Sequence, residues 1–255
     1  MKIDINSDMG EGFGPYRIGD DEALMGIVSS ANVACGFHAG DPLIMDRTVR
    51  MAKARGVGIG AHPGLPDLLG FGRRVIQMDA AEIEKHMLYQ IGALQALAAN
   101  AGHRVTHVSF HAAMGNMVNA DPDMADLVAR AIAAVDRDLI MFSMPDAEIV
   151  RAARKVGLRV LTLFLADRAY DENANLVSRK LPNSVITSPE AVAKRVQRFL
   201  DGGTVETIEG KSIKVEARSI LVHSDTPGSV NLAGTVRRVV EQGGGEVVPA
   251  TVLLG

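Results

Sequence analysis

Histidine and aspartate side chains recur in this sequence shortly after apolar stretches. Six positions follow the pattern, namely Asp8, His38, His62, His111, Asp167 and His223. Imidazole and carboxylate groups can exchange protons with a substrate, or they can bind a divalent metal that activates water. The sequence has no Gly-x-Ser-x-Gly turn, and its one cysteine, Cys35, lies in an apolar segment. The pattern favours acid/base or metal-assisted chemistry over a covalent nucleophile, and it does not choose between the two.

The elements that must position these residues are short apolar strands that alternate with amphipathic helices. Alternating strands and helices build a parallel sheet, and a closed parallel barrel brings the carboxyl ends of all its strands to one rim. The sequence therefore predicts an α/β fold, a seven-stranded (β/α) barrel with its site at that rim. We predict strands at residues 3–8, 31–35, 57–61, 105–110, 139–142, 158–165 and 219–223.

Local signals mark helix starts and one irregular segment. Capping residues predict helices that begin at Asp79, Asp121, Ser188 and Thr226, the last three directly before a proline. Residues 204–216 predict a β-hairpin that turns at Gly210. No linker, low-complexity tract or repeat divides the chain, so we expect one domain over 1–255, with the hairpin as an excursion.

The three remaining histidines have a different pattern. His107 lies within a predicted strand at an even spacing from His111, which predicts a place inside the barrel, and we interpret it as a core residue. His86 lies in a helix and His103 in a helix-to-strand turn, and we expect packing or surface roles for both.

Charge and composition exclude several classes of protein. The 255 residues include 27 Lys+Arg and 30 Asp+Glu, a net charge of −3, and the basic pairs are scattered. This balance gives no basis for binding nucleic acid or an anionic membrane. The first residues are too polar for a signal peptide, and no apolar stretch approaches the ~20 residues of a membrane span. We expect a cytoplasmic protein, which also suits a single cysteine.

Two segments imitate nucleotide-binding motifs and fail in their context. Gly210-Lys211-Ser212 matches the end of a P-loop, but Val205 stands where its first glycine belongs. Residues 56–61 have the spacing of a dinucleotide motif, yet they form a predicted strand that runs into His62 instead of a helix. We therefore expect no nucleotide-binding motif in this chain.

Six segments carry motifs that occur together in one known family. The second contains Val-Ala-Cys-Gly-Phe-His-Ala-Gly-Asp-Pro and the third contains Gly-Ala-His-Pro-Gly, and both are highly specific. On these segments the sequence resembles the LamB/YcsF family over nearly its whole length. The resemblance implies a seven-stranded barrel of the glycoside hydrolase/deacetylase type, which agrees with the strand count. The segments lie at residues 4–14, 30–42, 60–74, 166–170, 178–180 and 223–228.

The resemblance also implies an activity, partners and a source of energy. It implies hydrolysis of 5-oxo-L-proline to L-glutamate coupled to ATP hydrolysis, in a complex with the B and C subunits of a 5-oxoprolinase. Coupling suits the chemistry, because a five-membered lactam is an unstrained amide that readily re-forms. ATP would act through the complex, since the chain has no nucleotide motif of its own. A bound divalent metal stays an open alternative.

Roles can then be assigned to residues as a hypothesis. One or more of Asp8, His62 and His223 act as the base, or as metal ligands, for the attacking water. His38, His111 and Asp167 position the activated carbonyl group. Two arginines can hold the substrate carboxylate with paired hydrogen bonds. The predicted substrate-binding residues are Asn6, Glu11, Asp41, Arg73, Arg168 and Arg179.

The sequence departs from the family pattern around the fourth strand. The family reads Lys-Pro-His-Gly-Ala-Leu-Tyr-Asn there, whereas this chain has Ser109, Ala112 and Gly115 in place of the lysine, the first glycine and the tyrosine. Ser224 replaces the glycine of a His-Gly-Asp motif, and 173–174 replace an Asp-Gly pair. Two alternatives therefore remain. One is a stand-alone metal-dependent amide or N-acyl hydrolase, or deacetylase, and the other is a catalytically degenerate protein for binding or assembly.

Overall fold

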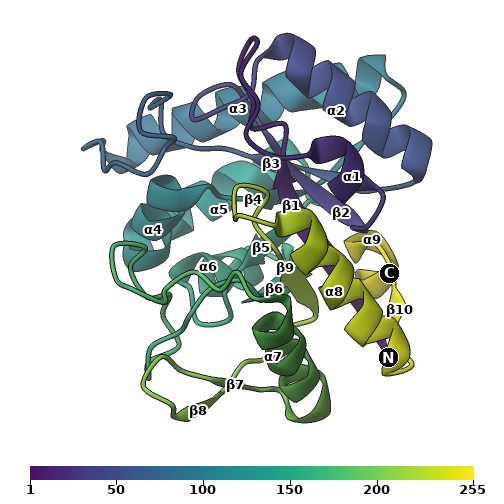
Figure 1. Ribbon diagram of the computed structural model, residues 1–255. Coiled ribbons are helices and arrows are strands. Elements are labelled where there is room, and N and C mark those ends of the chain that lie inside the picture. The colour runs from purple at the N-terminus through teal and green to yellow at the C-terminus, as the bar shows by residue number, and fades with distance from the viewer.

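Seven parallel strands close into a barrel in the computed structural model, which describes residues 1–255 (Figure 1). The last barrel strand pairs with the first, so that Asp4 lies opposite Ser219 and Asn6 opposite Leu221. This closure confirms the predicted fold. The barrel strands are β1 (Lys2–Met9), β2 (Ser30–Ala34), β3 (Gly58–His62), β4 (Val105–Ser109), β5 (Ile140–Ser143), β6 (Arg159–Leu165) and β9 (Ser219–Leu221). A short strand that the sequence pattern does not predict, β10 (Glu246–Val247), also pairs with the start of β1.

Helices surround the barrel, and their ends follow the local sequence. Asp79 and Glu82 form the predicted capping box of α3. Gly56 and Gly203, both in the left-handed region, end α2 and α7. The pattern does not predict the short helices α1 and α9, nor α4. The helices are α1 (Asp21–Met25), α2 (Pro42–Arg55), α3 (Ala80–Asn100), α4 (Ala112–Ala120), α5 (Pro122–Val135), α6 (Glu148–Lys155), α7 (Pro189–Gly202), α8 (Ser229–Gln242) and α9 (Ala250–Leu254).

The last long helix begins later than its sequence predicts. We predict a start at Thr226, but α8 starts at Ser229, after Gly228 with a φ of 77°. The Thr226 hydroxyl donates a hydrogen bond to Asp167 at 2.6 Å, which holds this residue in a turn beside β6. Thr226 therefore supports the rim of the barrel instead of capping the helix.

A small antiparallel hairpin lies between α7 and β9. It consists of β7 (Thr204–Glu206) and β8 (Ser212–Lys214), and it lies beside α7 at the lower end of Figure 1. The backbone N–H of Ile208 donates to the carbonyl of Tyr170 at 2.9 Å, which ties the hairpin to the loop after β6.

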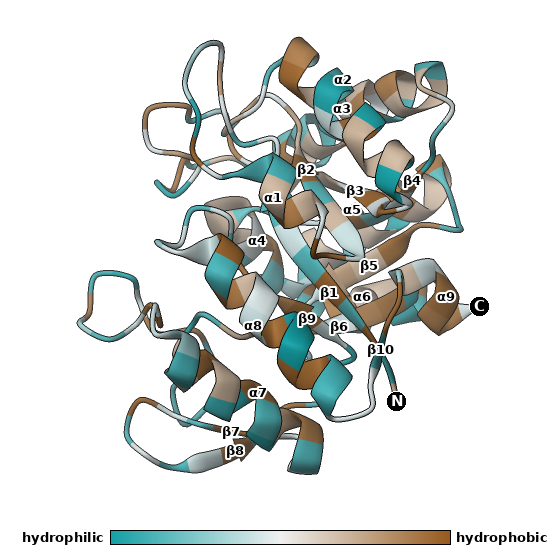
Figure 2. Cartoon of the chain, turned by 45° about the vertical axis from the view of Figure 1, so that its right-hand side comes forward, coloured by the Kyte–Doolittle hydropathy of each residue, from teal (hydrophilic) through white to brown (hydrophobic).

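Apolar side chains fill the layer between barrel and helices, whereas the barrel interior is polar. Brown and teal faces on α7 and α8 mark their apolar and polar sides in Figure 2. Inside the barrel, Asp4 accepts hydrogen bonds from Ser29 at 2.8 Å and Ser30 at 2.6 Å, and also from Ser219. Hydrogen-bonded partners of this kind offset the cost of burying polar groups.

No helix of this chain has the length and apolar character that a membrane crossing requires.

Candidate functional site

A cavity of about 670 Å³ opens at the carboxyl ends of the barrel strands. Asp8 at the end of β1, His62 at the end of β3, and His111 and His223 just after β4 and β9 line it. Apolar side chains of β5, β6 and β9 form one wall, and residues 176–180 form part of another. Parallel barrels build ligand sites at this end because all strand ends converge there.

The other two predicted catalytic residues lie directly behind the cavity lining. The His38 ring stacks on His111 with centroids 3.7 Å apart. Asp167 accepts a hydrogen bond from the His223 ring. The structure thus brings all six predicted catalytic residues to one region of the rim.

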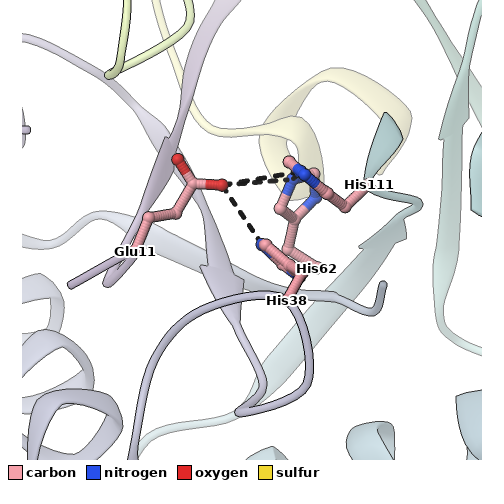
Figure 3. A group of neighbouring side chains, drawn as sticks. All are labelled: Glu11, His38, His62 and His111. Carbon is pink, nitrogen blue, oxygen red and sulfur yellow. Dashed lines mark hydrogen bonds and ion pairs between the residues drawn. The ribbon is translucent and has the colours of Figure 1, made fainter. Parts of the chain in front are cut away.

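Glu11, His38, His62 and His111 face one another in a buried cluster (Figure 3). Glu11 Oε1 lies 3.2 Å from His38 Nε2 and 3.5 Å from His111 Nδ1. His62 Nε2 lies 3.0 Å from His111 Nδ1 and 3.9 Å from Glu11 Oε1. Asp8 Oδ1 lies 3.5 Å from His62 Nε2. One ligand atom from each of the four cluster residues lies within 4.8 Å of the others, so the group could hold a metal ion.

Burial governs the charge of this cluster. It raises the pKa of Glu11 well above its usual range, and the neighbouring Asp8 carboxylate adds to the effect. Burial also lowers the pKa of His62, where the Asp8 charge and the hydrogen bond to the Ser109 carbonyl partly offset it. Burial and the neighbouring imidazoles lower the pKa values of His38 and His111 well below the usual histidine value. The three imidazoles are therefore neutral near pH 7.

The loop after β3 packs its backbone directly against the cluster. Gly72 has a φ of 63°, and a Cβ there would lie 2.6 Å from His38 Cβ and 2.8 Å from His111 Cδ2. Phe71, with a φ of 54°, accepts a hydrogen bond from His111 Nε2 on its carbonyl at 2.8 Å. Only glycine combines this φ with this approach, so Gly72 is required by the histidines that it covers.

His223 and Asp167 form a second polar pair on the other side of the cavity. His223 Nδ1 lies 3.0 Å from both carboxylate oxygens of Asp167, which also accepts from the His223 backbone N–H at 3.2 Å. Burial lowers the pKa of His223, but the Asp167 charge and hydrogen bond outweigh it, so the pKa is raised overall. The same contacts outweigh burial at Asp167 and lower its pKa. The pair leaves His223 Nε2 available to the cavity.

Three arginines contribute most of the positive charge that lines the cavity. Arg73 forms an ion pair with Asp225 at 2.6 Å, and Arg179 lies 3.7 Å from the other oxygen of the same carboxylate. Arg168 is buried and donates to the carbonyls of Ser184 at 3.2 Å and Val177 at 2.6 Å. Burial and the nearby Arg179 charge lower the pKa of Arg168 to about 10. With Lys180, which also lines the cavity, four cations stand against the carboxylates of Asp225 and Asp167, so this end of the cavity favours an anionic ligand.

Three predicted substrate-binding residues are not part of the cavity lining, and one of them, Glu11, lies in the buried cluster instead. Asn6 is buried deeper in the barrel, where it donates to Ser219 at 2.6 Å. Asp41 caps α2 by accepting from the backbone of Leu43 at 2.9 Å and Ile44 at 3.0 Å. Asn6 therefore supports the barrel interior, and Asp41 supports the start of α2. Asp41 stands directly before a proline, which is a helix-cap signal in the sequence.

The metal ligands suggested by the sequence also differ from the cluster found. We predict Asp8, His62 and His223, but only His62 belongs to the group whose donor atoms converge. The Nδ1 atom of His223 lies 3.0 Å from Asp167 Oδ1 and pairs with that carboxylate, so it does not face the cluster. Glu11 enters the cluster because the chain turns back after β1 at Gly10, which has a φ of 68°.

A buried amide and a core histidine support Asp8 from inside the barrel. Asn32 Nδ2 lies 2.9 Å from Asp8 Oδ1, and Asn32 Oδ1 lies 3.0 Å from His107 Nε2. The His107 ring stacks on Phe142 with centroids 4.1 Å apart. A Cβ on Gly60 would lie 2.1 Å from the His107 ring, so only glycine fits beside it. His107 is therefore interior, as predicted, and it also contacts the residue that holds Asp8.

The pairing of β3 and β4 explains how His107 reaches the interior. Ile59 pairs with Val105 and Gly60 with His107, so Thr106 is an extra residue in the ladder. Such a bulge redirects the side chains beyond it. The sequence pattern does not predict the contact of Asn32 with Asp8, because Asn32 lies in an apolar segment. A polar amide in a buried strand is the signal that indicates such a contact.

Comparison with known proteins places the chain in a family. The sequence profile of the LamB/YcsF family matches residues 3–254. The chain belongs to the LamB/YcsF family. A family relative from Bradyrhizobium diazoefficiens, named as a 5-oxoprolinase A subunit, is 87% identical over 254 residues, with 100% of both chains covered. A 5-oxoprolinase A subunit from Pectobacterium atrosepticum is 62% identical, covering 98% of this chain and 97% of the relative.

A solved structure agrees with this membership. The lactam utilization protein from Thermus thermophilus superimposes with a TM-score of 0.91 at 41% identity, covering 97% of this chain and 99% of the other. The LamB/YcsF barrel is therefore shared at high similarity over its whole length.

Four of the positions where this chain departs from the LamB/YcsF pattern lie at the site, whereas residues 173–174 lie outside the cavity lining. The carbonyl of Ser109 contacts His62 Nδ1 at 2.7 Å, and Gly115 lines the cavity. Ala112 has a φ of 34°, a conformation that suits the glycine of the family pattern better than alanine. The Ser224 hydroxyl donates to Glu11 Oε2 at 3.1 Å. These changes alter the cavity wall and leave the imidazoles and carboxylates in place.

Proposed function

We propose that this chain is the A subunit of an ATP-dependent 5-oxoprolinase and that its cavity is where the lactam ring opens. One observation carries the proposal: a single cavity is lined by a supported carboxylate, Asp8, by an imidazole, His223, and by a group of cationic side chains. The names of the two relatives and of the lactam utilization protein support this assignment and the same class of substrate.

The substrate carboxylate binds at the cationic end. Asp225 accepts a hydrogen bond from Arg73 at 2.6 Å, which orients this guanidinium group before a ligand arrives, and its charge keeps Arg179 nearby at 3.7 Å. A planar guanidinium group matches a carboxylate with two parallel hydrogen bonds. Anchoring the carboxylate there places the lactam ring over the floor of the cavity.

Ring opening needs a group that accepts a proton from water and a group that donates a proton to the leaving nitrogen, and two different side chains supply them. Water adds to the lactam carbonyl carbon and gives a proton to Asp8, which Asn32 holds at 2.9 Å. The C–N bond breaks with its electron pair going to nitrogen, which takes a proton from His223 Nε2. The raised pKa of His223 suits it to donate this proton.

The partner subunits supply the coupling to ATP. The chain carries no P-loop and no dinucleotide motif, so we assign ATP binding to the B and C subunits. We place the complex in the cytoplasm, where ATP is available and where a single unpaired cysteine is compatible with the redox state. We also take 1–255 as one domain, because β1 and β9 close the same barrel.

The test combines the chain with B and C subunits, ATP and 5-oxoproline, and measures glutamate and phosphate. Asp8→Asn and His223→Gln should each lower glutamate release by about 10²–10⁴-fold, the usual effect of losing a proton-transfer group. The matched control is Asp46→Asn, which removes a surface carboxylate that pairs with Arg50 in α2. Unchanged release in both site variants would instead identify a protein that serves only in binding or assembly.

A stand-alone amide hydrolase is the second candidate. The chain has its own cluster of potential metal ligands, and Ser109 and Gly115 leave small side chains where the family pattern has a lysine and a tyrosine. Hydrolysis of N-acyl amino acids or lactams by the chain alone, lost on chelation and without need for ATP, would favour this candidate. Activity only in the presence of ATP and both partners would reject it.

A further inference from the structure

Backbone carbonyls fix the proton positions on two of the clustered imidazoles. His62 Nδ1 lies 2.7 Å from the carbonyl of Ser109, and His111 Nε2 lies 2.8 Å from the carbonyl of Phe71. A carbonyl oxygen only accepts hydrogen bonds, so each of these nitrogens carries the ring proton. In a neutral imidazole the other nitrogen then presents a lone pair. His62 Nε2 and His111 Nδ1 are both acceptors.

These two acceptors face each other at close range. They lie 3.0 Å apart, and Glu11 Oε1 lies 3.5 Å from His111 Nδ1 and 3.9 Å from His62 Nε2. Asp8 Oδ1 adds a further acceptor 3.5 Å from His62 Nε2. Facing lone pairs and carboxylate oxygens are costly to bury without a cation between them. The geometry thus has a place for a positive charge.

The spacing of the donor atoms fits a metal ion. Zinc binds imidazole nitrogen and carboxylate oxygen at about 2.1 Å, which puts tetrahedral ligands about 3.4 Å apart. The three separations among Glu11, His62 and His111 are 3.0, 3.5 and 3.9 Å. Two nitrogens and one oxygen suit zinc and related transition metals, whereas magnesium and calcium prefer oxygen alone.

His38 belongs to the cluster but its ring orientation excludes it from the ligand set. Its ring is parallel to that of His111, with 5° between the planes and 3.7 Å between centroids. Lone pairs in two stacked planes cannot point at one ion. His38 Nε2 lies 3.2 Å from Glu11 Oε1, and its buried Nδ1 has no partner, so the ring proton belongs on Nε2 and orients the carboxylate. Residues behind metal ligands commonly have this role.

We propose that Glu11, His62 and His111 bind one divalent transition metal of the zinc class, with the fourth position open to the cavity. His62 and His111 line the cavity, as does Asp8 beside them, so a ligand at the fourth position would lie within the proposed reaction site. Three protein ligands with an open position are typical of catalytic zinc. The catalytic meaning of the site rests on the proposed function, whereas metal binding does not.

The test measures metal binding by the full chain without any assay of activity. Metal content after purification, and titration of the chelator-treated chain with Zn²⁺, should give one equivalent. Glu11→Gln should weaken Zn²⁺ binding beyond the 10–100-fold that residues behind the ligands produce. His111→Phe keeps the ring stack on His38 and removes both nitrogens, so it should have the same effect even if Glu11→Gln does not fold. Bound Co²⁺ should show the visible spectrum of a four-coordinate site.

The matched control is His223→Gln, which alters the same cavity outside the proposed ligand set. This variant should bind Zn²⁺ as the unmodified chain does. Loss of binding in His223→Gln with retention in Glu11→Gln and His111→Phe would overturn the assignment, and so would the absence of stoichiometric Zn²⁺, Co²⁺, Mn²⁺ or Fe²⁺ binding by the folded chain. Metal binding without 5-oxoprolinase activity in the complex would remove the proposed function and leave the metal site standing.

Discussion

Replacing His107 with phenylalanine should lower kcat for glutamate release in the assembled complex and leave KM nearly unchanged. His107 does not line the cavity, but its Nε2 lies 3.0 Å from Asn32 Oδ1, and Asn32 Nδ2 lies 2.9 Å from Asp8. Phenylalanine can still stack on Phe142, as the imidazole does. The substitution thus removes one hydrogen bond and keeps the packing.

The magnitude follows from the group left unpaired. Asn32 is completely buried, and an unsatisfied buried acceptor costs about 1–3 kcal/mol of stability. Asn32 Nδ2 still donates to Asn6 at 2.8 Å and to Asp8 at 2.9 Å, but its oxygen is no longer held from behind by His107. The amide can then shift and carry Asp8 with it, and a displacement of about 1 Å can cost 10²-fold in rate. We expect kcat to fall roughly 10- to 100-fold.

The assay compares His107→Phe with His107→Gln. The side-chain amide of glutamine can donate from about the position of the imidazole Nε2, so His107→Gln should recover most of the lost kcat. Denaturant unfolding of both variants measures the stability change separately. Equal kcat in the two variants would refute the reasoning, because kcat would then not depend on a hydrogen bond donated to Asn32. An effect confined to KM would refute it as well.

Three further predictions concern stability and substrate binding. The raised pKa of His223 means that its stabilising pair with Asp167 is complete below the ordinary histidine value of about 6.5 and is lost as pH rises through the raised value. The lowered pKa of Asp167 makes the same stabilisation present above about 3.9 and lost as pH falls through the lowered value. Urea midpoints against pH should show this window for the unmodified chain, and a His223→Gln variant with the same profile would contradict it. Ala112→Gly should raise the free energy of unfolding by roughly 0.5–1 kcal/mol, because relief of the strain at a φ of 34°, about 1–2 kcal/mol, exceeds the chain-entropy cost of glycine of about 0.4–1 kcal/mol. Chemical denaturation measures it, and a less stable variant would count against the strain. Arg179→Lys should raise KM for 5-oxoproline about tenfold with little change in kcat, since an ammonium group cannot form the paired hydrogen bonds. Steady-state kinetics distinguish this from a fall in kcat alone, which would place Arg179 outside substrate binding.

The barrel and the gathering of polar groups were predictable because they depend on periodicity. Apolar strands followed by His62, His111 or His223 specify a rim once the strands are parallel, since barrel geometry brings their ends together. The start of α3 was predictable in the same way, because Asp79 and the capping box that it forms are local in the sequence. These features need only local pattern and chirality.

Other features depend on pairings between distant segments, and the local sequence does not contain them. The bulge at Thr106 is defined by the pairing of β4 with β3. The sequence of β4 alone therefore predicts the side of the strand on which His107 lies, but not the direction of its side chain. Thr226 has the sequence of a helix cap, but its hydrogen bond to Asp167, 59 residues away, takes priority. The ligand geometry of Glu11 likewise depends on how the loop after β1 returns to meet His38.

The closure of the barrel between β1 and β9 has a consequence for how the protein is made. Asp4 and Asn6 find their partner Ser219 only after more than 200 further residues have been synthesised, as the separations of 215 and 213 show. Long-range parallel pairing is intrinsically slow, because the loop entropy is lost before the contacts form. An emerging chain can pair β1 with β2 and can bring Ser29 and Ser30 to Asp4, but the other edge of β1 has no partner and Asp8 has no His223 beside it until β9 docks. The cavity becomes competent in one late event rather than by gradual refinement, so truncated chains should hold neither fold nor activity.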